Sequence, residues 1–230
     1  MPIGGRPFLD FVLSSLADAG CRDVGLVIGP DQRGPFLEYL RRHPTTRTHV
    51  ELLEQAEPLG TADAVVSAAR WVGAAPFLVV NSDNLYPVDA LRDLIALDGP
   101  GLAVFDREEL VRSSNIPAER VAAFALVDVD RDGYLSRIIE KPGPEALAAA
   151  GAGALISMNS WRFDRGMVDV CREVPLSSRG EYELPHAVAL AIARGVRVKA
   201  IRARGEVLDL SQQTDVAEVS RRLAGIDPRP

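Results

Sequence analysis

Short apolar runs alternate with amphipathic stretches through the first 106 residues of the chain. The apolar runs predict buried strands at 24–28, 49–53, 77–80 and 101–105. Between them, apolar residues recur at helical spacing, which predicts helices at 8–19, 35–42, 62–72 and 88–97. Continuous apolar strands that alternate with helices are typical of a parallel sheet covered on both faces. The first half of the chain therefore predicts an α/β fold.

The pattern changes after about residue 106. Residues 121–128 alternate like an antiparallel strand, and the turn sequence at 130–133 separates them from a second strand at 134–139, so we expect a hairpin. Two further strands are expected at 154–158 and 196–201, and three helices at 163–171, 184–193 and 215–224. The Ala/Gly-rich residues 143–153 predict a short surface helix or a mobile loop, and we expect the tail at 225–230 to fray.

Composition narrows the class of protein. The 230 residues are 47% hydrophobic and 25% charged, which is ordinary for a globular α/β domain. A formal charge of −6 disfavours nucleic acid as a partner, because phosphate binding needs a basic face. The sequence has no apolar membrane span and no signal core, so we expect no membrane partner and a cytoplasmic location. Cys21 and Cys171 have no metal-site spacing, and we expect two reduced thiols.

The loop from Gln55 to Ala64 joins an expected strand to an expected helix and suits a nucleotide. A glutamine amide can donate and accept at the edge of a base, and Gly60 allows a base or ribose to approach the backbone. Thr61 can cap the next helix, whose start presents free N–H groups. A plain strand-to-helix turn would use the same residues, so the loop alone does not decide between these interpretations.

Polar residues also follow the strand at 77–80, in the segment Asn81-Ser82-Asp83-Asn84. Ligands of parallel sheets collect beyond the carboxyl ends of the strands, where the segment falls. A carboxylate there can hold Mg²⁺ while substrate phosphates fill most other coordination positions. A turn that caps the following helix explains the segment equally well.

Three later segments carry charge in loops or at strand ends. Glu140-Lys141-Pro142 closes a strand with opposite charges, which suit sugar hydroxyls and phosphates. Residues 180–183, Gly-Glu-Tyr-Glu, can close over a sugar, and Asp209 follows an apolar strand where it could be a second metal ligand. Each segment alone would be taken for an ordinary loop.

Together, in this order and at these intervals, the segments resemble the sugar-1-phosphate nucleotidyltransferases, which are NDP-sugar pyrophosphorylases, and most of all the bacterial members that use dTTP or UTP. The likeness runs from about residue 2 to 223, and Pro2 to Phe8 looks like the family's Pro-x-x-Gly-Lys/Arg-Pro segment. It implies a Rossmann-like, mostly parallel mixed sheet with helices on both faces. It also implies one domain at 1–224, with a nucleotide-binding half at 1–106, a sugar-binding half at 107–224 and a tail at 225–230.

The resemblance implies nucleotidyl transfer from a dTTP- or UTP-like triphosphate to a sugar 1-phosphate, with release of pyrophosphate. It also implies Mg²⁺ as cofactor and a possible homo-oligomer. The implied nucleotide-binding residues are Gln55, Pro58, Gly60, Thr61 and Asp83, and the implied metal ligands are Asp83 and Asp209. Lys141 and Asp83 would be catalytic, and Glu140, Asn159 and Glu181 would bind the sugar.

The sequence departs from the family pattern at two places. The family begins with a strand and a Gly-rich G-x-G-T-R loop that wraps the triphosphate, and neither precedes Pro2 here. In the family's sheet the strand order is 3-2-1-4. The first strand therefore lies between the strands expected here at 24–28 and 77–80. We therefore expect a truncated or misassigned start; the alternatives are a slot that another segment or chain fills, and a poorly stable, inactive relative. Leu208 stands where the family has Trp, which changes the packing beside Asp209.

Other function classes stay open. A homologue that binds sugar nucleotides without turnover would suit the absence of the Gly-rich loop. A glycosyltransferase would also use strand-end carboxylates, but it would not explain the loop at Gln55. A dinucleotide-binding protein is disfavoured, because no G-x-G-x-x-G follows the first expected strand.

Overall fold

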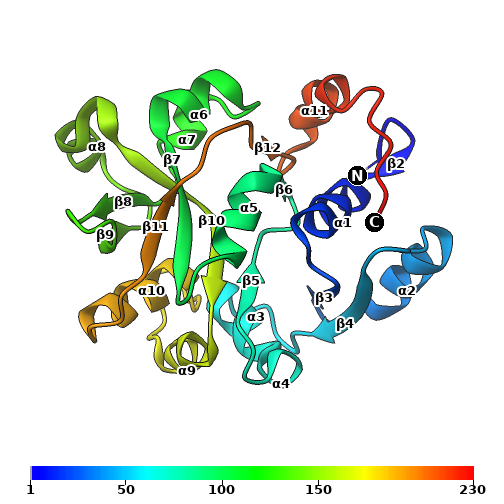
Figure 1. Cartoon of the computed structure of the whole chain (residues 1–230), viewed down its shortest axis with the longest axis horizontal. Helices are drawn as coiled ribbons and strands as arrows, with labels where there is room; N and C mark the ends of the chain where they lie inside the picture. The colour runs from blue at the N-terminus through cyan, green and yellow to red at the C-terminus, as the bar shows by residue number, and fades with distance from the viewer. Residues whose placement is uncertain (1) are drawn as a thin grey trace.

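A computed structural model describes residues 2–230 and builds them around one six-stranded sheet (Figure 1). Its strands are β5 (Phe77–Val79), β7 (Gly101–Asp106), β8 (Leu126–Val129), β9 (Leu135–Ile139), β10 (Leu155–Phe163) and β11 (Lys199–Arg202). Their order is β11-β7-β10-β8-β9, and β5 pairs with the second half of β10. Strand β10 is antiparallel to β5 and β7, and β7 is parallel to β11, so β5, β7 and β11 point the same way. The expected α/β class with a mixed sheet is confirmed.

Alternate residues of β7 face two separate hydrophobic cores. Ala103 and Phe105 belong to one cluster, which includes α1 (Phe8–Ala19) and α5 (Val88–Ile95). Leu102 and Val104 belong to the other. This second cluster is built with α3 (Thr61–Ser67), α9 (Arg165–Glu173) and α10 (Leu184–Ala193). Burial on both faces explains why β7 is a continuous apolar run rather than an alternating one.

Strands β3 (Asp23–Ile28) and β4 (His49–Glu54) form a separate parallel pair, which α2 (Arg33–Arg42) joins. Among residues 2–230, β3 pairs only with β4 and β5 only with β10. Most of the apolar side chains of β3 and all those of β5 are only half-buried. In the part of the chain that the structure describes, the two strands thus have no common neighbour.

Small elements connect these parts. β6 (Asn84–Leu85) and β12 (Leu208–Asp209) form an antiparallel ribbon, and β1 (Pro2–Ile3) pairs with β2 (Arg6–Pro7). A 3₁₀ turn (Gln213–Asp215) leads into α11 (Val216–Arg222). The helix expected at 62–72 is divided at Ala68 into α3 and α4 (Ala69–Val72). The Ala/Gly-rich segment forms α8 (Pro144–Ala150) and a 3₁₀ turn at Gly151–Gly153.

The strand expected from residue 121 is wrong in its first part. Two short helices, α6 (Arg107–Ser113) and α7 (Ala118–Val121), precede β8, which begins only at Leu126. Asp106 caps α6 by accepting a bond from the Glu109 N–H. Leu110 is the only buried residue of α6, so the helix left almost no apolar periodicity to detect.

The expected fraying of the C-terminal tail is also wrong. The Pro230 carbonyl accepts bonds from the N–H groups of Thr46 and Arg47 at 2.8 and 3.1 Å. The Arg229 N–H donates to the Ser14 hydroxyl at 3.0 Å, and Pro228 and Pro230 are buried. These contacts hold the tail between α1 and the start of β4, and Figure 1 shows both chain ends beside α1.

The helices and the two cysteines bear on two expectations drawn from composition. Across residues 2–230, no helix combines the length and the apolar character that crossing a membrane requires. Cys21 and Cys171 are free thiols, and burial raises the pKa of both. Neither thiol is poised for nucleophilic chemistry.

Candidate functional site

Gln55 follows β4, and its side chain is held inside its own loop. Its amide nitrogen donates to the Gly60 carbonyl at 3.1 Å and to the Asp63 carboxylate at 2.7 Å. Both partners are acceptors, so the orientation of the amide is determined and the nitrogen is used. Among residues 2–230 no donor bonds to Gln55 Oε1. The side chain therefore offers a ligand one fixed acceptor.

Gly60 adopts φ 115° and ψ 179°, a region that only glycine occupies readily. A Cβ there would stand 2.6 Å from the carbonyl oxygen of Tyr182. The Ala62 N–H donates to that oxygen, and the Tyr182 N–H donates to the Leu59 carbonyl, both at 2.8 Å. The backbone that approaches Gly60 is thus that of the segment before α10. Thr61 strengthens the same contact by accepting a bond from the first N–H of α10 at 2.9 Å.

Glu140, at the end of β9, is close enough to Glu183 for the charge of Glu183 to affect its pKa, and no such effect comes from Glu181. Burial raises the pKa of Glu140, and the nearby charge of Glu183 adds to the effect. Glu183 is 6% exposed and accepts a bond from the Ser177 hydroxyl at 3.0 Å. Arg179 pairs with both glutamates, with Glu181 at 3.1 Å and with Glu183 at 3.4 Å, and Glu181 is the more exposed of the two. Two carboxylates near each other suit the hydroxyls of a sugar.

Lys141 and Asn159 both have positive φ, at 48° and 57°. Lys141 is exposed, and it forms no salt bridge with any residue in the described part of the chain. Asn159 lies at the irregularity of β10 between Ser157 and Trp161, and its side-chain oxygen accepts a weak bond from the indole N–H at 3.4 Å. Left-handed residues outside glycine often mark functional positions, so both are candidates on geometric grounds. The exposed Pro58 lies on the surface of the Gln55 loop.

Asp83, which follows β5, has a half-buried carboxylate that accepts from its own backbone N–H and from no other residue in the described range 2–230. Burial raises the pKa of Asp83, and the charge of Asp209 raises it further. Asp83 also lines a cavity of about 440 Å³ together with Leu26 and Val27 of β3 and Phe8 of α1. A carboxylate in this setting gains from a bound cation.

Asp209 lies beside Asp83 and has partners on both carboxylate oxygens. The β6–β12 ribbon pairs Asp209 with Asn84, and the Leu210 N–H donates to the Asp83 carbonyl at 2.8 Å. The Asp209 carboxylate accepts bonds from Asn84 at 2.9 Å and from the Ser211 hydroxyl at 2.5 Å. It also pairs with Arg120 at 3.3 Å. The structure brings the two expected metal ligands together; three of the donors to Asp209 share its Oδ1, and its Oδ2 accepts only from Asn84.

The sequence-derived residues thus fall into two groups. Hydrogen bonds and charge contacts join the Gln55 loop to the segment before α10, and that segment to Glu140. The other group contains Asp83, Asp209 and Arg120. Sequence reasoning missed Glu183 and Arg120. Glu183 belongs to the motif already noticed, whereas Arg120 stands in a helix of four residues with no motif around it.

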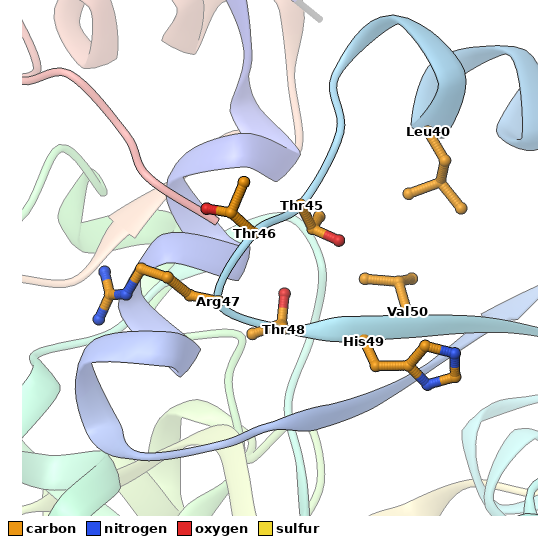
Figure 2. Close-up of a pocket in the computed structure, with 7 residues that line it drawn as sticks. All are labelled: Leu40, Thr45, Thr46, Arg47, Thr48, His49 and Val50. Carbon is orange, nitrogen blue, oxygen red and sulfur yellow. The ribbon is translucent and has the colours of Figure 1, made fainter.

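A second hollow lies away from these groups, between α2 and the start of β4 (Figure 2). It measures about 420 Å³, and Leu40, Thr45 and Val50 are among the residues that line it. The Arg47 side chain points away from the other lining side chains in Figure 2 and pairs with Asp18 at 2.7 Å. The hollow is at the amino end of β4, and Gln55 follows the carboxyl end, so no expected site residue lines it.

Comparisons with known proteins agree on one family. The family model described as nucleotidyl transferase matches residues 1–224. Glucose-1-phosphate thymidylyltransferase of Streptomyces antibioticus is 27% identical over 228 residues, which are 99% of this chain and 60% of that protein. The enzyme of the same name from Mycolicibacterium smegmatis is 27% identical over 209 residues, which are 89% of this chain and 67% of that protein.

The chain therefore spans less than two thirds of the Streptomyces protein. A crystal structure of UDP-glucose pyrophosphorylase complexed with UDP-glucose matches with a TM-score of 0.77. The match covers 96% of this chain and 88% of that chain at 17% identity, a level that supports the fold alone.

Proposed function

The chain belongs to the nucleotidyl transferase family, and we propose that it joins a nucleoside triphosphate to a sugar 1-phosphate, giving an NDP-sugar and pyrophosphate. The observation that carries the proposal is the half-buried carboxylate of Asp83, which stands at the end of β5 beside a cavity and is paired with no other side chain among residues 2–230. Within this proposal, residues 1–106 supply the nucleotide side and residues 107–224 the sugar side of one domain. A cytoplasmic location and a homo-oligomer belong to the same proposal.

The fixed orientation of the Gln55 amide favours thymine or uracil as the base. The free atom of this amide is the acceptor Oε1, because both hydrogens of the amide group are used within the loop. Thymine and uracil present an N3–H donor, whereas N3 of cytosine is an acceptor and would face Oε1 without a hydrogen bond. An unpaired polar contact of this kind costs about 1–3 kcal/mol. We therefore expect dTTP or UTP to bind at least about fivefold more tightly than dCTP or CTP.

The sugar 1-phosphate would be bound by Glu140, Glu183 and Lys141. In the proposed reaction an oxygen of the sugar phosphate attacks the α-phosphorus in line, and the bond to pyrophosphate breaks as the new bond forms. Such a reaction asks the protein for positioning and charge neutralisation rather than covalent chemistry. Lys141 would donate to the sugar phosphate, and the carboxylates of Glu140 and Glu183 would accept from sugar hydroxyls. Asn159 and Glu181 complete the proposed sugar side.

The charges near Asp83 fit a divalent cation. Asp83, Asp209 and Asp215 stand against the single guanidinium of Arg120, which leaves two negative charges uncompensated. A bound Mg²⁺ would neutralise charge on the substrate phosphates, and the Asp83 carboxylate would hold it.

A second candidate is a protein that binds the same ligands without turnover. The unshared edges of β3 and β5 favour it, because no described segment between them supplies backbone N–H groups for a triphosphate.

Calorimetry separates the two candidates. The chain is titrated with dTTP, UTP, dCTP and CTP in the presence of Mg²⁺, and the same mixtures are incubated with a panel of sugar 1-phosphates. Glucose 1-phosphate comes first, because the relatives' names contain it. Tight dTTP or UTP binding with formation of an NDP-sugar supports the transferase. Binding without product supports the second candidate, and no binding by any nucleotide contradicts both.

A further inference from the structure

Strand β10 contains a bulge at the residues that precede its pairing with β5. Residues 158–160 lie between Ser157 and Trp161, where the register with β7 shifts, and β7 has only Ala103 opposite them. On the other side of β10, pairing with β5 begins at Trp161. The three bulge residues therefore have no strand partner. The middle one is Asn159, whose φ of 57° is left-handed.

A tyrosine hydroxyl takes the place of the missing strand contact. Tyr86 follows β6 directly and is 4% exposed, and its hydroxyl donates to the Met158 carbonyl at 2.6 Å. The same hydroxyl accepts a weak bond from the Asn81 N–H at 3.4 Å. Because β5 runs antiparallel to β10, continued pairing of the two strands would place Asn81 opposite Asn159. The hydroxyl of Tyr86 thus bridges the end of β5 to the bulge.

The single hydrogen of this hydroxyl belongs to the Met158 carbonyl. The side-chain oxygen of Asn84 is a second acceptor, but it lies farther away, at 3.2 Å. Burial raises the pKa of Tyr86, so the hydroxyl keeps its proton. The Met158 carbonyl is part of the peptide plane that precedes Asn159. Its orientation therefore helps to set φ of Asn159, a value that residues other than glycine seldom adopt.

The Asn159 side chain is half-buried and keeps its donors for a ligand. Its oxygen accepts the weak bond from the Trp161 indole, and its amide nitrogen donates to none of residues 2–230. Resting on the proposed function, in which Asn159 contacts the sugar, we propose that the Tyr86 hydroxyl is a positioning group for that sugar. It fixes the peptide before Asn159 and thereby directs the Asn159 amide towards a sugar hydroxyl. Tyr86 itself touches no substrate in this arrangement.

Tyr86→Phe removes the hydroxyl and keeps the ring. Ser15→Ala is the matched control, because the buried Ser15 hydroxyl donates to the backbone carbonyl of Tyr86 at 3.2 Å and makes no contact with the bulge. Each variant loses a buried hydrogen bond at the same tyrosine, so each should lower the unfolding temperature. Only Tyr86→Phe should also weaken the binding of the sugar.

The contribution of the sugar is measured by calorimetry as a ratio of dissociation constants. UDP and dTDP are compared with their glucose, galactose, mannose and N-acetylglucosamine conjugates. The conjugate that gains most over its diphosphate in the wild-type chain is then used for all variants. Division by the dissociation constant of the diphosphate removes any effect on the nucleotide side.

We expect Tyr86→Phe to reduce this ratio at least about fivefold, or about 1 kcal/mol, while the affinity for the diphosphate stays within about twofold. Asn159→Ala should reduce the ratio by a similar factor. In the double variant, Tyr86→Phe should add less than about twofold, because it acts through Asn159. A wild-type ratio in Tyr86→Phe overturns the inference, as does an equal loss in Ser15→Ala or a fully additive loss in the double variant.

Crystal structures of the wild-type chain and of Tyr86→Phe test the positioning without any ligand. In the variant, the peptide between Met158 and Asn159 should turn, and φ of Asn159 should leave the left-handed region. An unchanged Asn159 overturns the inference even if sugar binding falls. A failure of the proposed function shows separately, in the wild-type chain alone, as binding of no nucleotide or as no gain from any sugar conjugate.

Discussion

Replacement of Gly60 by alanine tests how the Gln55 loop is held. The new Cβ would stand 2.6 Å from the Tyr182 carbonyl oxygen and 2.9 Å from its nitrogen, and both are backbone atoms that cannot rotate away. Alanine must also adopt φ near 115°, a conformation that costs about 1–3 kcal/mol. Relief of the clash separates the loop from Tyr182 and breaks their contact.

Two backbone hydrogen bonds are lost in that separation, from Ala62 to Tyr182 and from Tyr182 to Leu59. Each contributes about 0.5–1.5 kcal/mol. Added to the backbone strain, the expected loss in free energy of unfolding is about 2–6 kcal/mol. The measurement is urea unfolding followed by circular dichroism, with the free energy extrapolated linearly to water.

Gly20→Ala is the matched control. Gly20 also has positive φ, at 106°, but a Cβ there would meet nothing within 4 Å. Its substitution should cost only the backbone strain, about 1–2 kcal/mol. If Gly60→Ala costs no more than Gly20→Ala, the contact with Tyr182 does not hold the loop, and the argument for a fixed Gln55 fails with it.

Three further predictions concern charge, the tail and the sheet edge. Burial raises the pKa of Glu140 above its ordinary value of 4.5, so its ionised form destabilises the fold at pH 7. Glu140→Gln should therefore raise the unfolding temperature at pH 7, and the gain should fade as pH falls through the raised pKa towards 4.5 and disappear below it. A gain that persists unchanged at pH 3.5 would count against this explanation. Removal of residues 226–230 deletes seven hydrogen bonds; the three that involve the N–H groups of Thr46, Arg47 and Arg229 alone should cost about 1.5–4.5 kcal/mol in urea unfolding, whereas Asp227→Ala, an exposed change in the same tail, should cost little. In hydrogen exchange, the amides of β3 should exchange at least about a hundredfold faster than those of β7, because β3 has one unpaired edge and half-buried side chains; equal protection would show that the β3 edge is covered.

Elements with strong apolar periodicity could be predicted from the sequence. The helices at 8–19 and 184–193 have the expected bounds, because their buried faces repeat at helical spacing. Strand β10 is five residues longer than expected at its carboxyl end, reaching Phe163 instead of Met158. The polar Asn159 and Ser160 interrupt the apolar run there, although Ser160 is 1% exposed. A polar residue buried at a strand irregularity gives no sign of its burial in sequence.

Only part of the candidate site could be predicted from the sequence. Strand ends are visible as the points where apolar runs stop, so Gln55, Asp83 and Glu140 could be selected from their positions. The partners of these residues from distant segments could not be predicted in this way. Arg120 is 89 residues from Asp209, and no local pattern links the two. The sequence therefore suggests which carboxylates stand at the sheet edge, but not which of them is already neutralised by the protein.

Release of pyrophosphate in the wild-type chain and in Asp83→Asn tests the central claim most directly. The chain is incubated with dTTP or UTP, Mg²⁺ and a sugar 1-phosphate, and pyrophosphate is measured by a coupled phosphatase assay, with Asp128→Asn as the folded control. The account predicts steady release by the wild type and by the control, and a rate at least about a hundredfold lower in Asp83→Asn. Release at the wild-type rate by Asp83→Asn, or none by the wild type, would contradict it.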